Sequence, residues 1–498
     1  MILLLLNEAN FEYDIQGLIR AFYPKCNLMT RYTPGAEPKN SAPKKTYNEP
    51  EEFRVVVMYE GDKINVSLKV IDFFGEPEME DSITIEVDSS DRKDTKNRLK
   101  RGVYMLLSSF SGKILPWGTL TGIRPTKIPL NMLEEGKSRE FIENYMKETY
   151  LISDKKLDIA LSVATKEHKL LKDIDYDNGY SLYIGIPFCP STCLYCSFPS
   201  YAFASVEGQV EKYSEALFHE IEEVSDMLRG RELTSIYIGG GTPTSLSSDQ
   251  IDRLLSKVED CFDLSSIHEF TVEAGRPDSI TRDKLVTLKN HGVGRISINP
   301  QTMKQETLKL IGRHHTVEAV EESFNMAREV GFNCINMDLI LGLPGEDVND
   351  VRNTLERVSA MKPDNLTVHS LALKRSSRLN IEWDSYSNYL MENSDKHMNL
   401  AHEYAAKLGL EPYYLYRQKN MAGNLENVGF AKAGLEGLYN VLIMEEKQSI
   451  IALGAGSACK YVSCHGKTVT RSENVKDVGE YIERIDEMIE RKRNALEG

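Results

Sequence analysis

The 498-residue chain has only eight cysteines and two tryptophans, and its 75 acidic residues outnumber its 60 basic ones. The net charge of -15 argues against a general nucleic-acid binder, which needs a basic surface. No apolar run approaches the roughly 20 residues that cross a bilayer, and the apolar residues 1–6 lack the basic region of a signal peptide. We therefore expect a cytoplasmic protein without nucleic-acid or membrane partners. Cysteines stay reduced in that compartment, so metal binding is favoured over disulfides.

The length of the chain exceeds one ordinary domain. We expect an N-terminal α/β domain (1–150), a helical connector (151–178), a barrel (179–370) and a mostly helical C-terminal domain that covers the substrate (371–498). Within the first segment, residues 53–59 and 64–70 predict a β-hairpin, and 91–110 predicts a helix. The Trp-, Gly- and Pro-containing stretch 115–127 predicts an ordered linker packed against the next domain.

From residue 179 onward, strand-like and helix-like runs alternate, which is typical of β/α units with a parallel sheet. The expected strands are 182–186, 235–238, 269–272, 295–299, 333–341 and 365–369. Helices are expected between and after them, at 206–228, 249–261, 281–291, 303–310, 316–330 and 348–360. Six strands predict a partial (β/α)6 TIM-like barrel, in which catalytic groups gather at the carboxyl ends of the strands.

Cys189, Cys193 and Cys196 follow the first expected barrel strand with the spacing C-x3-C-x2-C. Three thiolates on one loop suit soft metal chemistry, whereas a closed zinc site needs four ligands. No fourth cysteine or histidine lies nearby, so the pattern fits a [4Fe–4S] cluster with one open iron, or zinc with a distant fourth ligand. The remaining cysteines are expected to be small core residues: Cys26, Cys261, Cys334, Cys459 and Cys464.

Further motifs lie at the carboxyl ends of the later strands. A run of three glycines and Thr242 follows the second strand, and glycines let the backbone approach a ligand closely. Glu273, Gln301 and Asp338 end or lie on the third, fourth and fifth strands, and Arg313 follows the fourth. Because these strand ends surround one mouth, we expect their polar groups to converge on a ligand.

Together these motifs resemble the oxygen-independent coproporphyrinogen III oxidase family of radical S-adenosylmethionine (SAM) proteins. The segments Y-x-x-I-P-F-C, G-G-G-T-P-T, I-G-R and D-L-I-x-G-L-P stand in the order of that family, over about residues 180–460. Residues 116–127, P-W-G-x-L-T-G-I-R-P-T-K, are similar to the HemZ-type coproporphyrinogen dehydrogenase group. The resemblance implies a radical SAM barrel with a [4Fe–4S] cluster and one or two SAM molecules.

The resemblance also implies a role for each matching residue. Cys189, Cys193 and Cys196 would bind the cluster. The implied SAM-binding residues are Tyr183, Tyr195, Gly240, Gly241, Thr242, Glu273, Gln301, Arg313, Asp338 and Ala372. Among them, Tyr183, Arg313 and Asp338 would be catalytic.

The implied reaction decarboxylates two propionates of coproporphyrinogen III to vinyl groups, giving protoporphyrinogen IX in anaerobic haem and porphyrin biosynthesis. The enzyme, expected to be a monomer, would receive electrons from a donor such as flavodoxin or ferredoxin. Basic residues near the mouth are candidates for binding this tetracarboxylate: Arg276, Lys374, Arg375, Arg378, Arg417 and Lys419.

Two positions differ from the oxidases of the family, since Gly185 replaces a histidine and Phe198 replaces a fourth cysteine. The C-S-F-P run is more similar to relatives that serve as haem chaperones, but those carry H-N-x-x-Y-W where this chain has Lys419 and Asn420. Two alternatives therefore stay open. One is a haem-binding chaperone that keeps the [4Fe–4S]/SAM site, and the other is a different radical SAM reaction on a tetrapyrrole.

Overall fold

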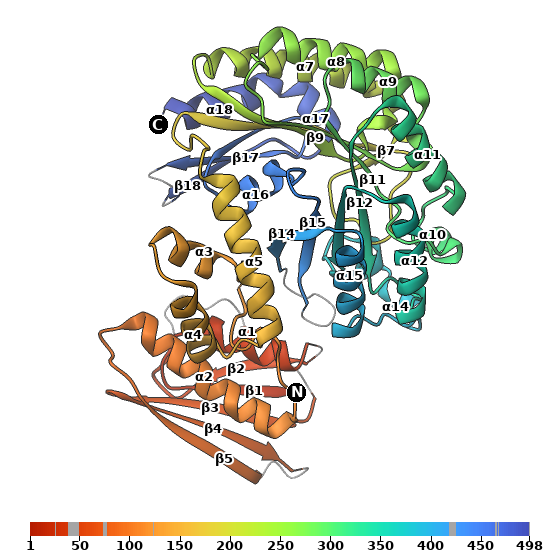
Figure 1. Ribbon diagram of the computed structural model, residues 1–498. Helices are drawn as coiled ribbons and strands as arrows, with labels where there is room; N and C mark the ends of the chain where they lie inside the picture. Colours follow the sequence, from red (N-terminus) through yellow and green to blue (C-terminus); the bar gives the residue numbers. More distant parts are fainter. Residues whose placement is uncertain are drawn as a thin grey trace. The chain divides into compact units, whose positions relative to one another are not determined.

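The computed structural model describes residues 1–24, 26–37, 49–72, 77–122, 124–417, 425–463, 466 and 468–497 (Figure 1). The chain divides into two compact units, Met1–Ser162 and Val163–Gly498, and the division falls within the helix α5 (Asp154–Leu171). No helix in the described part of the chain is both long and apolar enough to cross a membrane.

The first unit contains a five-stranded sheet of order β2-β1-β3-β4-β5. Its strands are β1 (Ile2–Leu6), β2 (Leu28–Tyr32), β3 (Phe53–Glu60), β4 (Lys63–Ile71) and β5 (Pro77–Glu86). Its helices before α5 are α1 (Glu12–Phe22), α2 (Arg92–Ser111), α3 (Lys127–Glu134) and α4 (Arg139–Tyr150). The predicted hairpin is confirmed as β3 and β4, which pair antiparallel, and the predicted helix over 91–110 is α2. Buried residues of the sheet, α1 and α2 form one apolar core.

The described part of the Trp-, Gly- and Pro-containing stretch packs against the end of α4. Trp117 is buried, and Gly118 has a φ of 54° in the left-handed region that favours glycine. A Cβ at Gly118 would lie 2.0 Å from the carbonyl oxygen of Tyr150, which also accepts a 2.8 Å hydrogen bond from the amide of Thr119. This close approach gives the stretch a packing role within the first unit, whereas the sequence predicts a linker packed against the next domain.

The second unit is built on an 11-stranded sheet of order β14-β15-β13-β12-β11-β10-β9-β6-β16-β17-β18. The six predicted barrel strands are confirmed, and consecutive ones pair in parallel. They are β6 (Gly179–Ile186), β9 (Glu232–Gly240), β10 (Glu269–Gly275), β11 (Arg295–Ile298), β12 (Cys334–Leu341) and β13 (Asn365–Ser370). The fold is thus the predicted partial TIM-like barrel.

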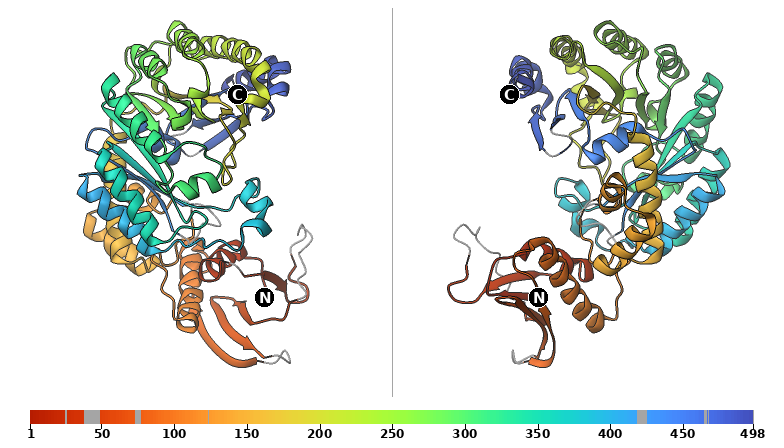
Figure 2. Two further views of the ribbon diagram at one scale, coloured as in Figure 1. Left: turned by 90° about the vertical axis from the view of Figure 1, so that its right-hand side faces the viewer. Right: turned by 60° about the vertical axis from the view of Figure 1, so that its left-hand side comes forward.

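Helices cover the outer face of this curved sheet, as Figures 1 and 2 show. They are α7 (Val210–Met227), α8 (Ser248–Cys261), α9 (Arg282–Asn290), α10 (Gln305–Leu310), α11 (Val317–Val330) and α12 (Val348–Met361). Each has its apolar residues on the buried side; in α8, for example, Ile251, Leu254, Leu255 and Val258 face inward. The crossovers lie where the sequence predicts them.

Residues after β13 extend the sheet at both ends. They supply the strands β14 (Glu411–Tyr416), β15 (Asn427–Ala431), β16 (Ser449–Leu453), β17 (Ala458–Ser463) and β18 (Thr468–Glu473). Their helices are α13 (Arg378–Ile381), α14 (Trp383–Tyr386), α15 (Asp395–Lys407), α16 (Leu438–Glu445), α17 (Val478–Glu483) and α18 (Ile485–Glu497). Because β16 pairs in parallel with β6, it adds a seventh parallel strand beside the strand that leads into the cysteine loop.

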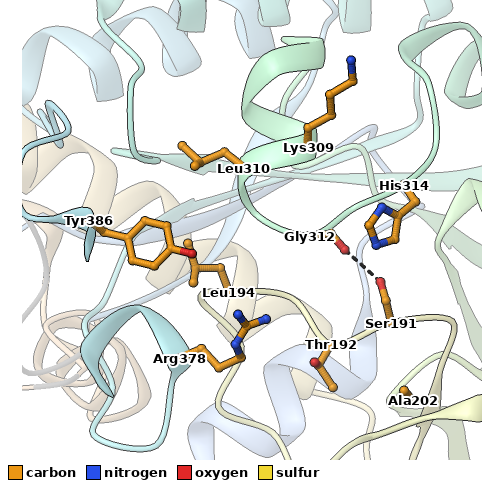
Figure 3. A pocket seen from close by; sticks show the side chains of 10 residues that line it. All are labelled: Ser191, Thr192, Leu194, Ala202, Lys309, Leu310, Gly312, His314, Arg378 and Tyr386. Carbon is orange, nitrogen blue, oxygen red and sulfur yellow. Dashed lines mark hydrogen bonds between the residues drawn. The ribbon is translucent and has the colours of Figure 1, made fainter. Parts of the chain in front are cut away.

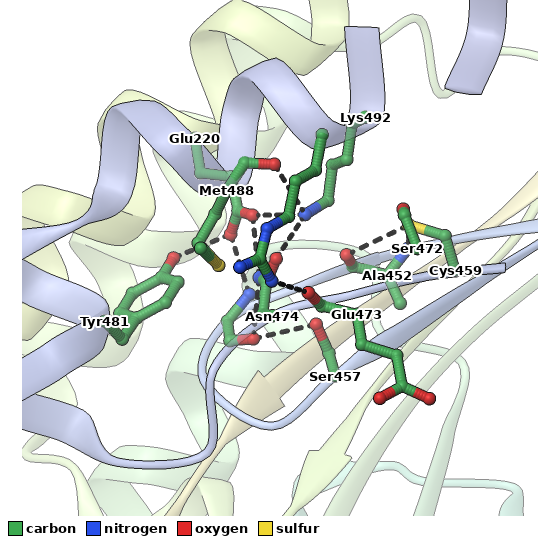
Figure 4. Close-up of polar contacts among 12 residues, drawn as sticks. Glu220, Ala452, Ser457, Cys459, Ser472, Glu473, Asn474, Tyr481, Met488 and Lys492 are labelled. Carbon is green, nitrogen blue, oxygen red and sulfur yellow. Dashed lines mark hydrogen bonds and ion pairs between the residues drawn. The ribbon is translucent and has the colours of Figure 1, made fainter. Parts of the chain in front are cut away.

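A buried ion pair ties the C-terminal helix to this part of the barrel (Figure 4). Nζ of Lys492, on α18, lies 2.7 Å from a carboxylate oxygen of Glu220, on α7, and both side chains are at most 1% exposed. The carboxylate also accepts hydrogen bonds from the amide of Gly454, at 2.8 Å, and from the hydroxyl of Tyr481, at 2.6 Å. Asn474 donates to it as well. The network therefore fixes the turn after β16 next to the end of β6.

Candidate cofactor site

The loop that carries the three cysteines is held closed at both ends. It contains the short strand β7 (Phe188–Cys189), which pairs with β8 (Tyr201–Ala202) at the far end of the loop. Between them, the amide of Leu194 donates to the carbonyl of Ile311 at 2.9 Å, and the amide of Cys196 donates to the carbonyl of Cys193 at 3.2 Å. The cysteines are unpaired by disulfides and only partly buried, so the loop presents three thiols from a fixed backbone.

These thiols line a cavity of about 430 Å³ at the carboxyl ends of the parallel strands. Nearly all of the predicted site residues line the same cavity: Cys189, Cys193, Tyr195, Cys196, Gly240, Gly241, Thr242, Glu273, Gln301, Arg313, Asp338 and Ala372. The exception is Tyr183, which lies in an aromatic stack with its ring centroid 6.3 Å from that of Tyr237. A Cβ built on Gly240 would lie 3.1 Å from the Tyr183 hydroxyl, so Tyr183 is one layer behind the cavity wall.

The glycine run and Thr242 pack against the backbone that leads into the cysteine loop. The amide of Gly241 donates to the carbonyl of Ile186 at 2.8 Å, and the amide of Thr242 donates to that of Phe188 at 2.7 Å. A Cβ at Gly241 would lie 2.6 Å from the Phe188 carbonyl oxygen, a distance that real Cβ atoms do not tolerate. The run is therefore required for packing against the loop as well as for exposing its backbone to the cavity.

Two side chains of neighbouring strands hydrogen-bond to the thiols. The hydroxyl of Thr242 lies 3.5 Å from Sγ of Cys189, and Nη1 of Arg276 lies 3.9 Å from Sγ of Cys193. Burial raises the pKa of the Cys189 thiol and raises that of Cys196 to about 11. Both thiols would lose their protons on binding a metal.

Gln301 and Arg313 bring unsatisfied polar atoms to the cavity. Gln301 has a φ of 66°, which is strained for a residue with a side chain. Its backbone is held against β12 by two hydrogen bonds, because its amide donates to the carbonyl of Asp338 and its carbonyl accepts from the amide of Ile340. Among the described residues, neither Oε1 of Gln301 nor Nε of Arg313 has a hydrogen-bond partner, although both atoms are buried. Such atoms are expected to find partners in a bound ligand.

Two carboxyl groups in the cavity have opposite pKa shifts. Burial raises the pKa of Glu273 to about 7, although the hydroxyl of Tyr237 donates a hydrogen bond to its carboxylate. Burial also acts on Asp338, but hydrogen bonds and the nearby His369 outweigh it and lower the pKa of Asp338. At neutral pH the cavity therefore contains one ionised carboxylate and one that is close to half-protonated.

His369 is a cavity residue to which the sequence analysis gave no role. Its Nε2 lies 3.9 Å from Oδ2 of Asp338, and its Nδ1 lies 3.4 Å from the hydroxyl of Tyr416, on β14. His369 lies near the carboxyl end of β13, which is the same criterion that identified Asp338 on β12. Applying that criterion to every strand would have found it.

A family model described as the Radical SAM superfamily matches residues 183–358. The Bacillus subtilis (strain 168) protein HemZ, named an oxygen-independent coproporphyrinogen-III oxidase-like protein, is 38% identical over 496 residues, covering 99% of this chain and 97% of HemZ. The chain belongs to the HemZ-type, oxygen-independent coproporphyrinogen III oxidase-like family of radical SAM proteins.

Two further proteins are similar to this chain. The haem chaperone HemW of Bacillus subtilis (strain 168) is 34% identical over 312 residues, covering 62% of this chain and 76% of HemW. The solved structure of coproporphyrinogen III oxidase, HemN, from Escherichia coli is 24% identical with a TM-score of 0.50, covering 65% of this chain and 73% of HemN. The HemN structure has the same fold, which agrees with the partial barrel.

The cofactors of the radical SAM family are a [4Fe–4S] cluster and SAM, and the cavity fits both. Three thiols and the unsatisfied atoms of Gln301 and Arg313 line it together. Within the described ranges, no three His, Cys, Asp or Glu side chains are arranged to hold a single metal ion. A cubane cluster offers each ligand a separate iron atom, so its three thiolates need not converge on one point.

Gly185, where the oxidases of the family have a histidine, lies under the end of β16. The hydroxyl of Tyr213 donates to its carbonyl at 2.6 Å, and a Cβ there would lie 3.3 Å from the carbonyl of Leu453. The pairing of β16 with β6 leaves little room for a side chain at this position.

The candidate substrate-binding cations have different surroundings. Arg276 is buried in contact with Asp278, and Arg417 is buried near Glu426, with its pKa lowered to about 10 by burial. Lys374 lines the cavity, whereas Arg375 is exposed. Lys419 and Asn420 lie outside the described residues.

Arg378 lines a second pocket, of about 340 Å³, on another side of the cysteine loop (Figure 3). The loop forms part of its wall through Ser191, whose hydroxyl donates to the carbonyl of Gly312 at 2.8 Å. Arg378 itself pairs with Glu382 on the surface of α13. The pocket shares no cysteine with the 430 Å³ cavity.

Proposed function

We propose that this protein is a cytoplasmic oxidoreductase that decarboxylates coproporphyrinogen III to protoporphyrinogen IX by radical SAM chemistry, in anaerobic haem biosynthesis. The main support is that the cysteine thiols and the polar groups of successive strand ends line one cavity. The name of HemZ, which aligns over nearly the whole chain, supports the choice of substrate.

In this proposal Cys189, Cys193 and Cys196 hold the cluster. When bound, the reduced cluster and SAM supply a 5′-deoxyadenosyl radical, which can remove a hydrogen atom from an unactivated carbon. The unsatisfied atoms of Gln301 and Arg313 bind polar groups of SAM, and Arg313 suits its carboxylate. Tyr183 lies behind the wall next to Gly240 and does not line the cavity.

Each of the two propionates reacts by the same steps. A hydrogen atom leaves the carbon attached to the pyrrole ring, the bond to the carboxylate carbon breaks, carbon dioxide leaves, and one electron passes to a one-electron acceptor. The product side chain is a vinyl group. Protein side chains need not supply a proton, so the acidic groups Glu273 and Asp338 serve binding and electrostatics in this scheme.

The second candidate is a haem-binding chaperone that keeps the cluster and SAM. Two observations favour it: HemW is 34% identical over 62% of this chain, and Phe198 occupies the place of the fourth cysteine of the oxidases. A different radical SAM reaction on a tetrapyrrole is the third.

The test is anaerobic. The cluster is reconstituted, dithionite, SAM and coproporphyrinogen III are added, and products are followed by mass spectrometry. We expect protoporphyrinogen IX together with 5′-deoxyadenosine. Deoxyadenosine without a vinyl product would overturn the decarboxylase, and tight stoichiometric haem binding without turnover would favour the chaperone.

A further inference from the structure

Phe198 is an exposed aromatic residue at the solvent end of the cofactor cavity. It is 70% exposed although it lies two residues after Cys196, and it lines the same cavity as the three thiols. Exposed apolar side chains are common on protein surfaces. This one differs because an aromatic ring at a cavity wall offers a flat apolar surface to whatever enters.

Lys374 lines the same cavity from the loop after β13 and is half-buried. Burial lowers its pKa, and no charged group in the described part of the chain contributes to offset that effect. The other basic residues of the cavity either have protein partners or are assigned to SAM in the proposed function, as the unsatisfied Nε of Arg313 is. Arg276 pairs with Asp278 at 2.6 Å, Arg313 donates to the carbonyl of Asn299, and His369 faces Asp338.

The charges of the cavity favour one orientation of an anionic ligand. Asp338 on β12 is ionised, Glu273 on β10 is close to half-protonated, and bound thiolates add negative charge to the same cavity. A carboxylate is repelled from these groups and attracted to the ammonium of Lys374. A ligand that carries both an apolar ring and carboxylates can therefore place the ring on Phe198 and one carboxylate on Lys374.

We propose that Phe198 and Lys374 form a substrate subsite at the mouth of the cavity, which takes an apolar macrocycle that carries carboxylates. This assignment rests on the proposed function for the identity of the macrocycle. The ring packs on Phe198, and Lys374 pairs with one carboxylate. SAM also carries a carboxylate, so the test has to distinguish pairing of Lys374 with the macrocycle from pairing of Lys374 with SAM.

The test measures binding without turnover, so it is independent of the reaction. Coproporphyrin III and an analogue with all four carboxylates converted to amides are titrated into reconstituted protein without reductant, and Soret absorbance is followed. SAM affinity is measured separately by equilibrium dialysis. The variants are Lys374→Met, Lys374→Arg and Phe198→Ala. The first control is Lys309→Met, because Lys309 lines the second pocket (Figure 3). The second control is Ile381→Ala, because Ile381 is an exposed apolar residue elsewhere.

We expect Lys374→Met to weaken coproporphyrin binding about tenfold or more, as loss of a charge-assisted contact does, and to leave the amide analogue unaffected. Lys374→Arg should retain binding, and Phe198→Ala should weaken both ligands. The controls and the affinity for SAM should not change.

Unchanged coproporphyrin binding in Lys374→Met, with the fold intact by circular dichroism, would overturn the subsite. Weaker SAM binding in that variant would instead assign Lys374 to the carboxylate of SAM. The expected binding pattern without any vinyl product in the mass-spectrometric assay would keep the subsite and reject the decarboxylation.

Discussion

Arg276 connects the end of β10 to the loop that carries the cysteines. Its Nη1 donates to the carbonyl oxygen of Ser191 at 2.8 Å, and its Nη2 pairs with Asp278 at 2.6 Å. The side chain of Arg276 is 3% exposed. Arg276 is therefore an anchor of the loop, and not the free surface cation that would bind a substrate carboxylate.

Arg276→Met should destabilise the cysteine loop. Breaking a buried pair leaves Asp278 uncompensated and costs about 3–5 kcal/mol. We expect the iron content after reconstitution to fall to less than half of the wild-type value and the melting temperature to drop. Arg282→Met is the matched control, because Arg282 pairs with Glu329 at the exposed surface, where such pairs contribute about 0–1 kcal/mol. Wild-type iron content in Arg276→Met would contradict this role.

Gly241→Ala should displace the cysteine loop, because Gly241 packs against its backbone. The added methyl group would meet the carbonyl oxygens of Phe188 and Ile186 at 2.6 and 2.8 Å, and backbone atoms cannot move aside easily. We expect a loss of about 1–3 kcal/mol or more in the free energy of unfolding, measured by urea denaturation. Gly294→Ala is the control, because nothing lies within 4 Å of a Cβ at that position. Equal stability of the two variants would refute the close packing.

Replacing Lys492 tests whether the C-terminal helix is locked to the barrel. Lys492→Met leaves the carboxylate of Glu220 buried without its cation, which should cost about 3–5 kcal/mol. Adding Glu220→Gln to this variant removes the unpaired charge and should recover part of the loss. Arg493→Met, which breaks a surface pair with Glu223, should change stability by less than about 1 kcal/mol. If Lys492→Met alone were as stable as the wild type, the buried ion pair would not be needed for stability.

Glu273 should make stability depend on pH. Its pKa is raised from 4.5 to about 7 in the folded protein, so the unfolded chain releases this proton first. Stability from this group is therefore complete below pH 4.5 and decreases as pH rises towards 7, by up to about 3 kcal/mol. In Glu273→Gln this decrease should be absent, and urea unfolding at pH 5 and pH 7.5 measures the difference. Parallel pH curves for both proteins would disprove the shift.

The barrel and most of the cavity could be predicted because each depends on local sequence. Glu273 and Asp338 are polar residues within the apolar strands β10 and β12, so the strand pattern and the polar position both show within a few residues. Parallel pairing then brings such positions of neighbouring strands together. The spacing of the three cysteines is equally local. These features need no knowledge of which distant segments pair.

The features that the sequence did not reveal depend on distant partners. The 449–453 segment is an ordinary short apolar run, and nothing in it indicates that it pairs with β6, more than 260 residues earlier in the chain. That pairing brings the carbonyl oxygen of Leu453 within 3.3 Å of a Cβ at Gly185. In the same way, the charge of Arg276 gave no sign that Ser191, on another loop, would bury it.

The central claim is that the three cysteines of one loop hold a cluster that cleaves SAM. It is tested most directly by measuring 5′-deoxyadenosine formed from SAM by reconstituted, dithionite-reduced protein. Cys193→Ala should abolish product, whereas Cys261→Ala should retain the wild-type rate, because Cys261 ends α8 and does not line the cavity. Continued formation of deoxyadenosine by Cys193→Ala would contradict the assignment of the cluster to this loop.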